Sequence, residues 1–130
     1  MLKKILGFNA AFSLAHAVAL LFWPVTLAHI LFVPDFTLFD LSAAVILQIL
    51  AGGLFGFGAY VGFVAFKLPA LKNQARLIIM ADWSWVIATI LLFVFVGSIF
   101  TAAGMVFFAI IAAIVAGFAL KQSRCLKLGD

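Results

Sequence analysis

The sequence contains no glutamate and very little charge of any kind. Charged residues make up 9% of the 130 residues, whereas hydrophobic residues make up 68%. A water-soluble domain needs a polar surface to meet the solvent, and this composition cannot supply one. The shortage of charge therefore excludes an ordinary soluble domain.

Groups that carry out chemistry are also scarce. Cys125 is the only cysteine, so the chain cannot form an internal disulfide. One cysteine and two distant histidines, His16 and His29, do not form a typical metal site. We find no nucleophile–base spacing and no glycine-rich phosphate loop after a strand. The sequence predicts a protein that is not an enzyme and that has no metal ion and no resident cofactor.

Long apolar runs dominate what is present. They cover residues 5–23, 41–66, 77–96 and 99–120. About 20 apolar residues in a helix match a hydrocarbon core of about 30 Å. Membrane barrel strands would alternate apolar and polar residues, and these runs are apolar all round. The sequence predicts an all-α membrane protein, a four-transmembrane-helix bundle that forms a single domain over residues 1–130.

The connection over residues 24–40 is too apolar for a solvated loop. It is also too short to cross the membrane, and Pro24 and Pro34 interrupt it. We expect a semi-buried apolar outer loop with a short interfacial helix near residues 26–32.

The basic residues lie outside the apolar runs and alternate with uncharged or acidic connections. This positive-inside pattern predicts that both termini are cytoplasmic, in a bacterial inner membrane. The net charge of +4 then reflects topology and lipid headgroup contact, so we expect no nucleic-acid partner. The residues concerned are Lys3, Lys4, Lys67, Lys72, Arg76, Lys121, Arg124 and Lys127.

Small residues recur at helical spacing in two of the runs. The second run holds the GxxxG pairs Gly52/Gly56 and Gly58/Gly62, and the fourth holds a row of alanines. Small residues let helix backbones approach closely in membranes. We expect them to pack helices together, either within the chain or against another subunit. The alanines are Ala109, Ala113 and Ala116.

The first run carries a polar stripe. Asn9, Ser13 and His16 are spaced four and three residues apart and share one helix face. His16 lies near the bilayer centre, where an ionisable residue is a functional candidate. It could relay a proton, bind a polar substrate or ligate a haem or chlorin. Alternatively, it is a neutral imidazole hydrogen-bonded to Gln48 or Thr89.

Asp82 is the only acidic residue inside a predicted span. An unpaired carboxylate is costly there, and Asn9 lies at a similar depth. Asp82 either couples to a proton or cation, or forms a polar clasp between the third span and the first or fourth. Trp83 and Trp85 follow it, and with Trp23 they are expected to be interfacial anchors.

These features favour a non-catalytic accessory or assembly subunit that packs against the helices or lipids of a larger membrane complex. Its expected partners are membrane lipids and other membrane subunits, or further copies of itself. One alternative is a small oligomeric transporter or channel that uses the Asn9/Ser13/His16 stripe. A second is a haem- or chlorin-binding subunit with His16 as axial ligand.

Overall fold

The structure is a computed structural model that describes residues 1–68 and 70–127. Four of its helices are long and apolar enough to cross a membrane. The predicted all-α four-helix membrane bundle is therefore confirmed. The elements within the described residues are α1 (Leu2–Phe22), α2 (Pro24–Leu31), β1 (Thr37–Leu38), β2 (Leu41–Ser42), α3 (Ala43–Phe66), α4 (Gln74–Val96), the 3-10 turn η1 (Gly97–Ile99) and α5 (Ala102–Lys127).

Local chemistry sets the helix boundaries around the outer loop. Trp23 separates α1 from α2, and Pro24 is the first residue of α2, where its missing N–H is not needed. The chain then makes a two-residue hairpin, whose turn residues Phe39 and Asp40 have φ angles of 52° and 62°. Such mirror-image turns match the twist of paired strands. Ser42 caps α3, since its Oγ accepts a hydrogen bond from the Val45 N–H over 3.4 Å.

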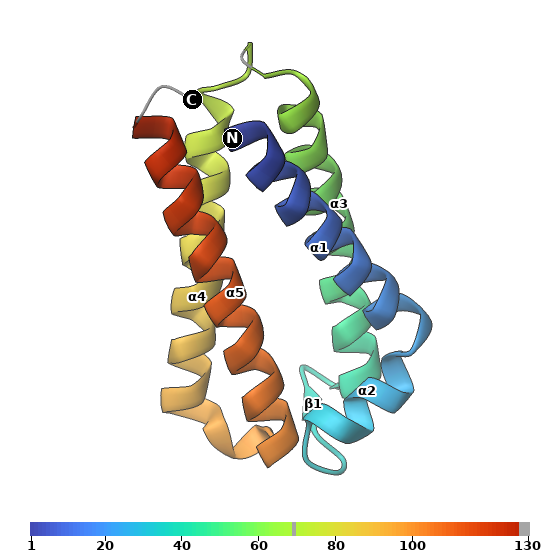
Figure 1. Ribbon diagram of the computed structural model, residues 1–130. Coiled ribbons are helices and arrows are strands. Elements are labelled where there is room, and N and C mark those ends of the chain that lie inside the picture. Colours follow the sequence, from blue (N-terminus) through green and yellow to red (C-terminus); the bar gives the residue numbers. More distant parts are fainter. Residues whose placement is uncertain (69, 128–130) are drawn as a thin grey trace.

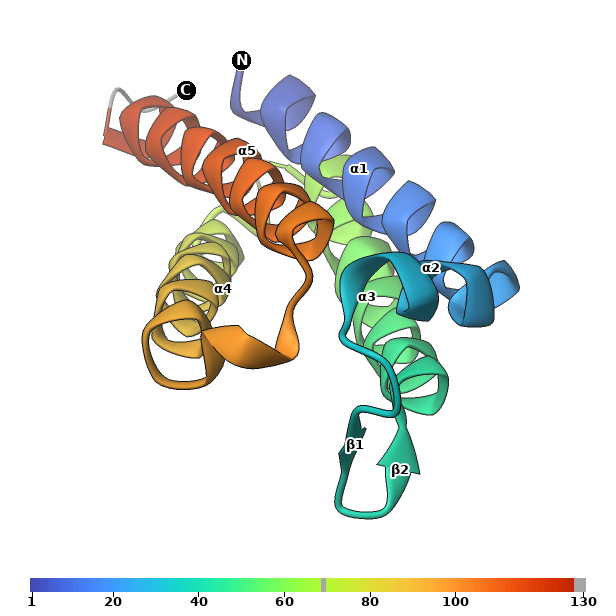
Figure 2. The same ribbon diagram turned by 90° about the horizontal axis from the view of Figure 1, so that it is seen from below.

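The long helices form two antiparallel pairs, α1 with α3 and α4 with α5 (Figure 1). Contacts between α1 and α5 join the pairs, whereas α3 and α4 scarcely touch. Figure 2 shows the two pairs converging at α1 and α5 and parting between α3 and α4. The start of α1 and the end of α5 lie at one end of the bundle, which we call the terminal end; the opposite end, near β1 and β2, is the hairpin end.

Only one of the two glycine pairs on α3 packs against a helix of the same chain. A Cβ at Gly58 would lie 2.9 Å from Leu14 Cγ, and one at Gly62 would lie 3.7 Å from Ala10 Cβ. Gly58 and Gly62 thus let α3 approach α1 closely. Gly52 and Gly56 are exposed, and a Cβ there would meet no other atom of the described residues within 4 Å. Gly56 and Gly58 are two residues apart, so they are rotated by about 200° around the helix.

The alanine row expected on the fourth span also faces largely outward. Ala109 and Ala113 are exposed and Ala116 is only partly buried. The alanines that α5 buries are instead Ala112 and Ala119. The sequence revealed a small-residue pattern, but the buried face depends on where the other helices lie.

The last helix is longer than expected. We predicted that the fourth span covers residues 99–120, but α5 continues to Lys127. Its basic residues Lys121 and Arg124 are exposed, while Gln122 and Cys125 are buried. Residues three apart share a helix face, so one helix can solvate the cations and still bury the residues between them.

The two helix pairs are joined at the hairpin end through the start of α5. The Val33 N–H donates to the Ile99 carbonyl over 2.9 Å, and the Thr101 N–H donates to the Leu31 carbonyl over 3.1 Å. A Cβ at Gly104 would collide with the Leu31 carbonyl oxygen. We call this contact between residues 31–33 and 99–104 the hairpin-end contact.

The close approach at Gly104 yields a stability prediction. Gly104→Ala places a methyl group against backbone, so it should destabilise the protein by about 1–3 kcal/mol and lower the Tm in detergent. Gly117→Ala on the same helix is the control, since a Cβ there meets nothing within 4 Å. Equal melting temperatures for the two variants would contradict the hairpin-end contact.

Candidate functional site

Three helices meet in a buried polar cluster near the terminal end. Asn9 Nδ2 on α1 donates to Asp82 Oδ2 on α4 over 2.9 Å and to Gln122 Oε1 on α5 over 3.0 Å. Gln122 Nε2 donates to the same Asp82 Oδ2 over 2.9 Å. Ser13 Oγ donates to Asn9 Oδ1 over 3.4 Å. We call Asn9, Ser13, Asp82 and Gln122 the polar cluster.

The polar cluster is almost sealed from solvent. Asn9 is 1% exposed, Asp82 3% and Gln122 0%. Polar groups buried this deeply must find partners within the protein, because each unpaired one is costly in an apolar environment. Asp82 lies eight residues into α4, about 12 Å along the helix axis. The cluster therefore ties α1, α4 and α5 together inside the span of the bundle.

The Asp82 carboxyl group is held by neutral amides alone. Within residues 1–68 and 70–127, no Lys or Arg side chain forms an ion pair with it. Lys3, Lys4 and Lys121, which lie on the helices that supply the polar cluster or beside it, are exposed. The structure thus buries a carboxyl group without a cationic partner from the described chain.

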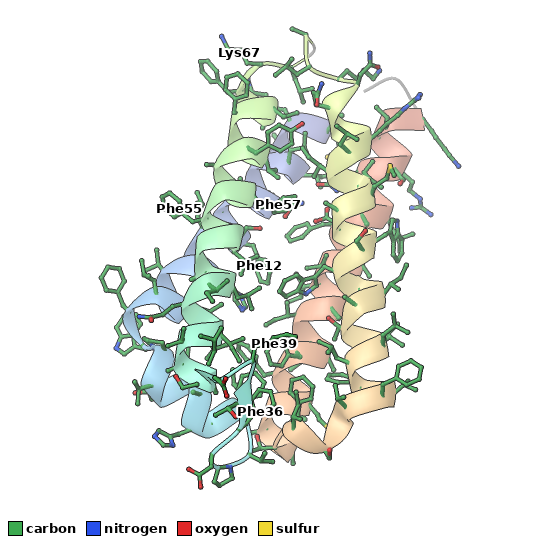
Figure 3. The ribbon with its side chains drawn as sticks, turned by 180° about the vertical axis from the view of Figure 1, so that it is seen from behind. Phe12, Phe36, Phe39, Phe55, Phe57 and Lys67 are labelled. Atoms are coloured by element: carbon green, nitrogen blue, oxygen red, sulfur yellow. The ribbon has the colours of Figure 1, made fainter. Side chains whose placement is uncertain are left out.

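A cavity of about 430 Å³ adjoins the polar cluster. All four long helices line it, and its wall is mostly apolar. Ile49 and Gly53 of α3 and Ala81 of α4 line the cavity and are exposed, so it opens on the side where α3 and α4 scarcely touch. In Figure 3, Phe12 and Phe57 point into the space between the helix pairs, whereas Phe55 points away. The lining residues are Asn9, Phe12, Ser13, His16, Ile49, Leu50, Gly53, Leu54, Phe57, Ala81, Asp82, Trp85, Ile111 and Val115.

His16 lies apart from the polar cluster, between two cavities. It lines the 430 Å³ cavity and a second one of about 280 Å³ toward α2 and α5. Its ring centroid is 5.5 Å from those of Phe12 and Phe107. Of the stripe expected on the first span, Asn9 and Ser13 therefore share one site, and His16 belongs to another part of the wall.

The hydrogen bonds expected for His16 are not formed. Gln48 is exposed, and Thr89 Oγ1 donates to the Trp85 carbonyl over 2.9 Å. In the described part of the chain, the imidazole donates or accepts no hydrogen bond. His29 lines a separate hollow at the hairpin end. Across the same residues, no group of three His, Cys, Asp or Glu side chains could hold a metal ion.

The tryptophans differ in their surroundings. Trp23 lies at the junction of α1 and α2 and is 58% exposed, so its side chain is free to contact the membrane interface. Trp83 is only partly buried. Trp85 is partly buried and lines both the 430 Å³ cavity and a third cavity of about 220 Å³. Its Nε1 is buried, with no hydrogen-bond partner among the described residues.

Sequence reasoning missed Gln122, which completes the polar cluster. The predicted fourth span ended at residue 120, so Gln122 lay outside it. The available signal was its spacing from Val115 and Ala119, which continues one buried face at seven and three residues. Nothing between Leu120 and Lys127 breaks a helix, so that face could have been extended.

We compared the chain with known protein families, with curated proteins and with solved structures, and no match was found. The site is therefore interpreted from its own geometry.

Two substitutions of Asp82 test whether its hydrogen bonds or its charge stabilise the bundle. Asp82→Asn should stay folded, because the amide oxygen can still accept from Asn9 and Gln122. Asp82→Leu should lower the Tm clearly, since each buried donor left unpaired costs about 1–3 kcal/mol. Thermal unfolding in one detergent measures both variants. A leucine variant as stable as the asparagine variant would show that the cluster does not hold the bundle.

Proposed function

We propose that this protein is a small, non-catalytic integral membrane protein that holds a lipophilic molecule in the cavity between its helix pairs. The observation that carries the proposal is the 430 Å³ cavity, which joins a long apolar wall to a few convergent polar groups. Small-molecule sites typically measure about 300–1,000 Å³ and combine these two kinds of surface.

The route of entry follows from the parted helices. A lipophilic molecule dissolved in the bilayer can reach the cavity sideways between α3 and α4, where the chain offers few contacts of its own. It would place its apolar body against Ile49, Leu54 and Val115 and its polar end toward Asp82. A molecule in the cavity would give the lining side chains van der Waals contacts that they lack when the cavity is empty.

Such a protein would act as an accessory or assembly subunit of a larger membrane complex. The span that includes α4 is the least covered, with 17% of its most apolar window buried within the chain. Gly56 on α3 also faces outward and would admit the backbone of a neighbouring helix. From these exposed surfaces we propose that the partners are membrane lipids and other subunits, or further copies of this chain.

A matched pair of variants tests this function. Gly53 lines the cavity and Gly52 does not, although neither would bring a Cβ within 4 Å of another group. We expect a lipophilic molecule to co-purify with the wild type in mild detergent, and Gly53→Phe, which places a benzyl group in the cavity, should displace it. Gly52→Phe should retain that molecule.

Mass spectrometry of extracted small molecules and of co-migrating subunits gives both readouts from one purification. Equal small-molecule content in the two variants would contradict the cavity as a binding site. A wild-type protein that migrates alone in every mild detergent would contradict the accessory role.

We also propose that both termini face the cytoplasm of a bacterial inner membrane. The basic residues lie at the ends of the helices that meet at the terminal end, while Asp35 and Asp40 lie at the hairpin end. In a Cys125→Ala background, Thr37→Cys should react with a membrane-impermeant thiol reagent from outside. Lys72→Cys should react only after the inner membrane is permeabilised. The reverse pattern would overturn the orientation.

A further inference from the structure

The cavity combines one acidic group with aromatic walls. Among the described residues, Asp82 is the only one that lines the cavity with a carboxyl group. Phe12, Phe57 and Trp85 supply aromatic rings from three different helices. The other titratable residue of the wall is His16, seven residues from Asn9 and so about 10 Å further along α1. The acidic end and the imidazole are therefore separate parts of the wall.

We propose that the molecule held in this cavity is an amphipathic organic cation, with its positive centre at Asp82 and its apolar body along the groove. This inference rests on the proposed function and specifies its ligand. The known hydrogen bonds of the carboxyl group converge on Oδ2 from two neutral amides, which fix its position and supply no positive charge. A cation entering from the bilayer would supply the missing countercharge.

The aromatic rings favour the same ligand class. A cation within about 6 Å of an aromatic ring face is attracted by the ring quadrupole, and more strongly where water is excluded. Phe12 and Phe57 point into the space between the helix pairs, and they line the same cavity as Asp82. An anionic lipid head would meet the carboxylate as a like charge, and a neutral molecule would leave its charge uncompensated.

The test compares two probes of equal shape. Benzyltrimethylammonium carries a positive charge, and neopentylbenzene replaces its nitrogen by carbon. Equilibrium dialysis with the full chain in a neutral detergent, corrected for micelle partitioning, should show saturable binding of the cation. Asp82→Asn should weaken that binding by about tenfold or more, which corresponds to about 1.4 kcal/mol. Binding of neopentylbenzene should stay unchanged, which also shows that the variant keeps its cavity.

Further variants keep the test independent of the polar cluster. Phe57→Leu leaves the hydrogen bonds of Asp82 to Asn9 and Gln122 in place. It should weaken binding of the cationic probe about threefold or more, because an aromatic ring near the cation is lost. Gly53→Phe should abolish binding of both probes, and Gly52→Phe should preserve both.

The outcomes distinguish the two proposals. If Asp82→Asn binds the cation as tightly as the wild type, or Phe57→Leu does, the cation assignment is wrong. If the neutral probe alone binds and Gly53→Phe removes it, the cavity function stands and the cation assignment fails. If neither probe binds to the wild type, both proposals fail.

Discussion

The hydrogen bonds that converge on Asp82 Oδ2 are the constraint on which the bundle depends. Asn9 and Gln122 bring donors from α1 and α5 to one oxygen of α4. Between membrane helices there is little hydrophobic driving force, because lipid tails are as apolar as the side chains they would replace. A polar contact worth about 0.6–2 kcal/mol per bond, together with close packing, then decides which helices meet.

The hydrogen bonds to Asp82 also help to set the shape of the molecule, because they hold the two helix pairs together near one end. The polar cluster joins the helix pairs near the terminal end, and the hairpin-end contact at Gly104 joins them at the other. Between these points α3 and α4 are free to part, and the cavity lies in that interval. A site for a lipophilic ligand thus follows from where the helices are tied, with no separate domain to form it.

The sequence predicted the membrane spans well because their signal is local. Runs that are apolar all round predicted α1, α3 and α4 to within about three residues. The buried faces were harder, because they depend on neighbours: Gly58 packs on α1 while Gly56 is exposed. Asn9 and Asp82 were recognisable as candidates by depth, but Gln122 lay beyond the expected helix end. The cavity is a property of parted helices, and no local pattern encodes it.

The most direct test of this account is the side-chain amide spectrum of the protein by NMR. The resonances of Asn9 and Gln122 should both shift when Asp82 is replaced by asparagine, because their N–H groups donate to its Oδ2. The resonance of Asn73, exposed beside the first turn of α4, should not move. Joint movement of the first two is the predicted result. If the side-chain amide resonances of Asn9 and Gln122 do not shift in the Asp82→Asn variant, the hydrogen bonds to Asp82 Oδ2 are contradicted.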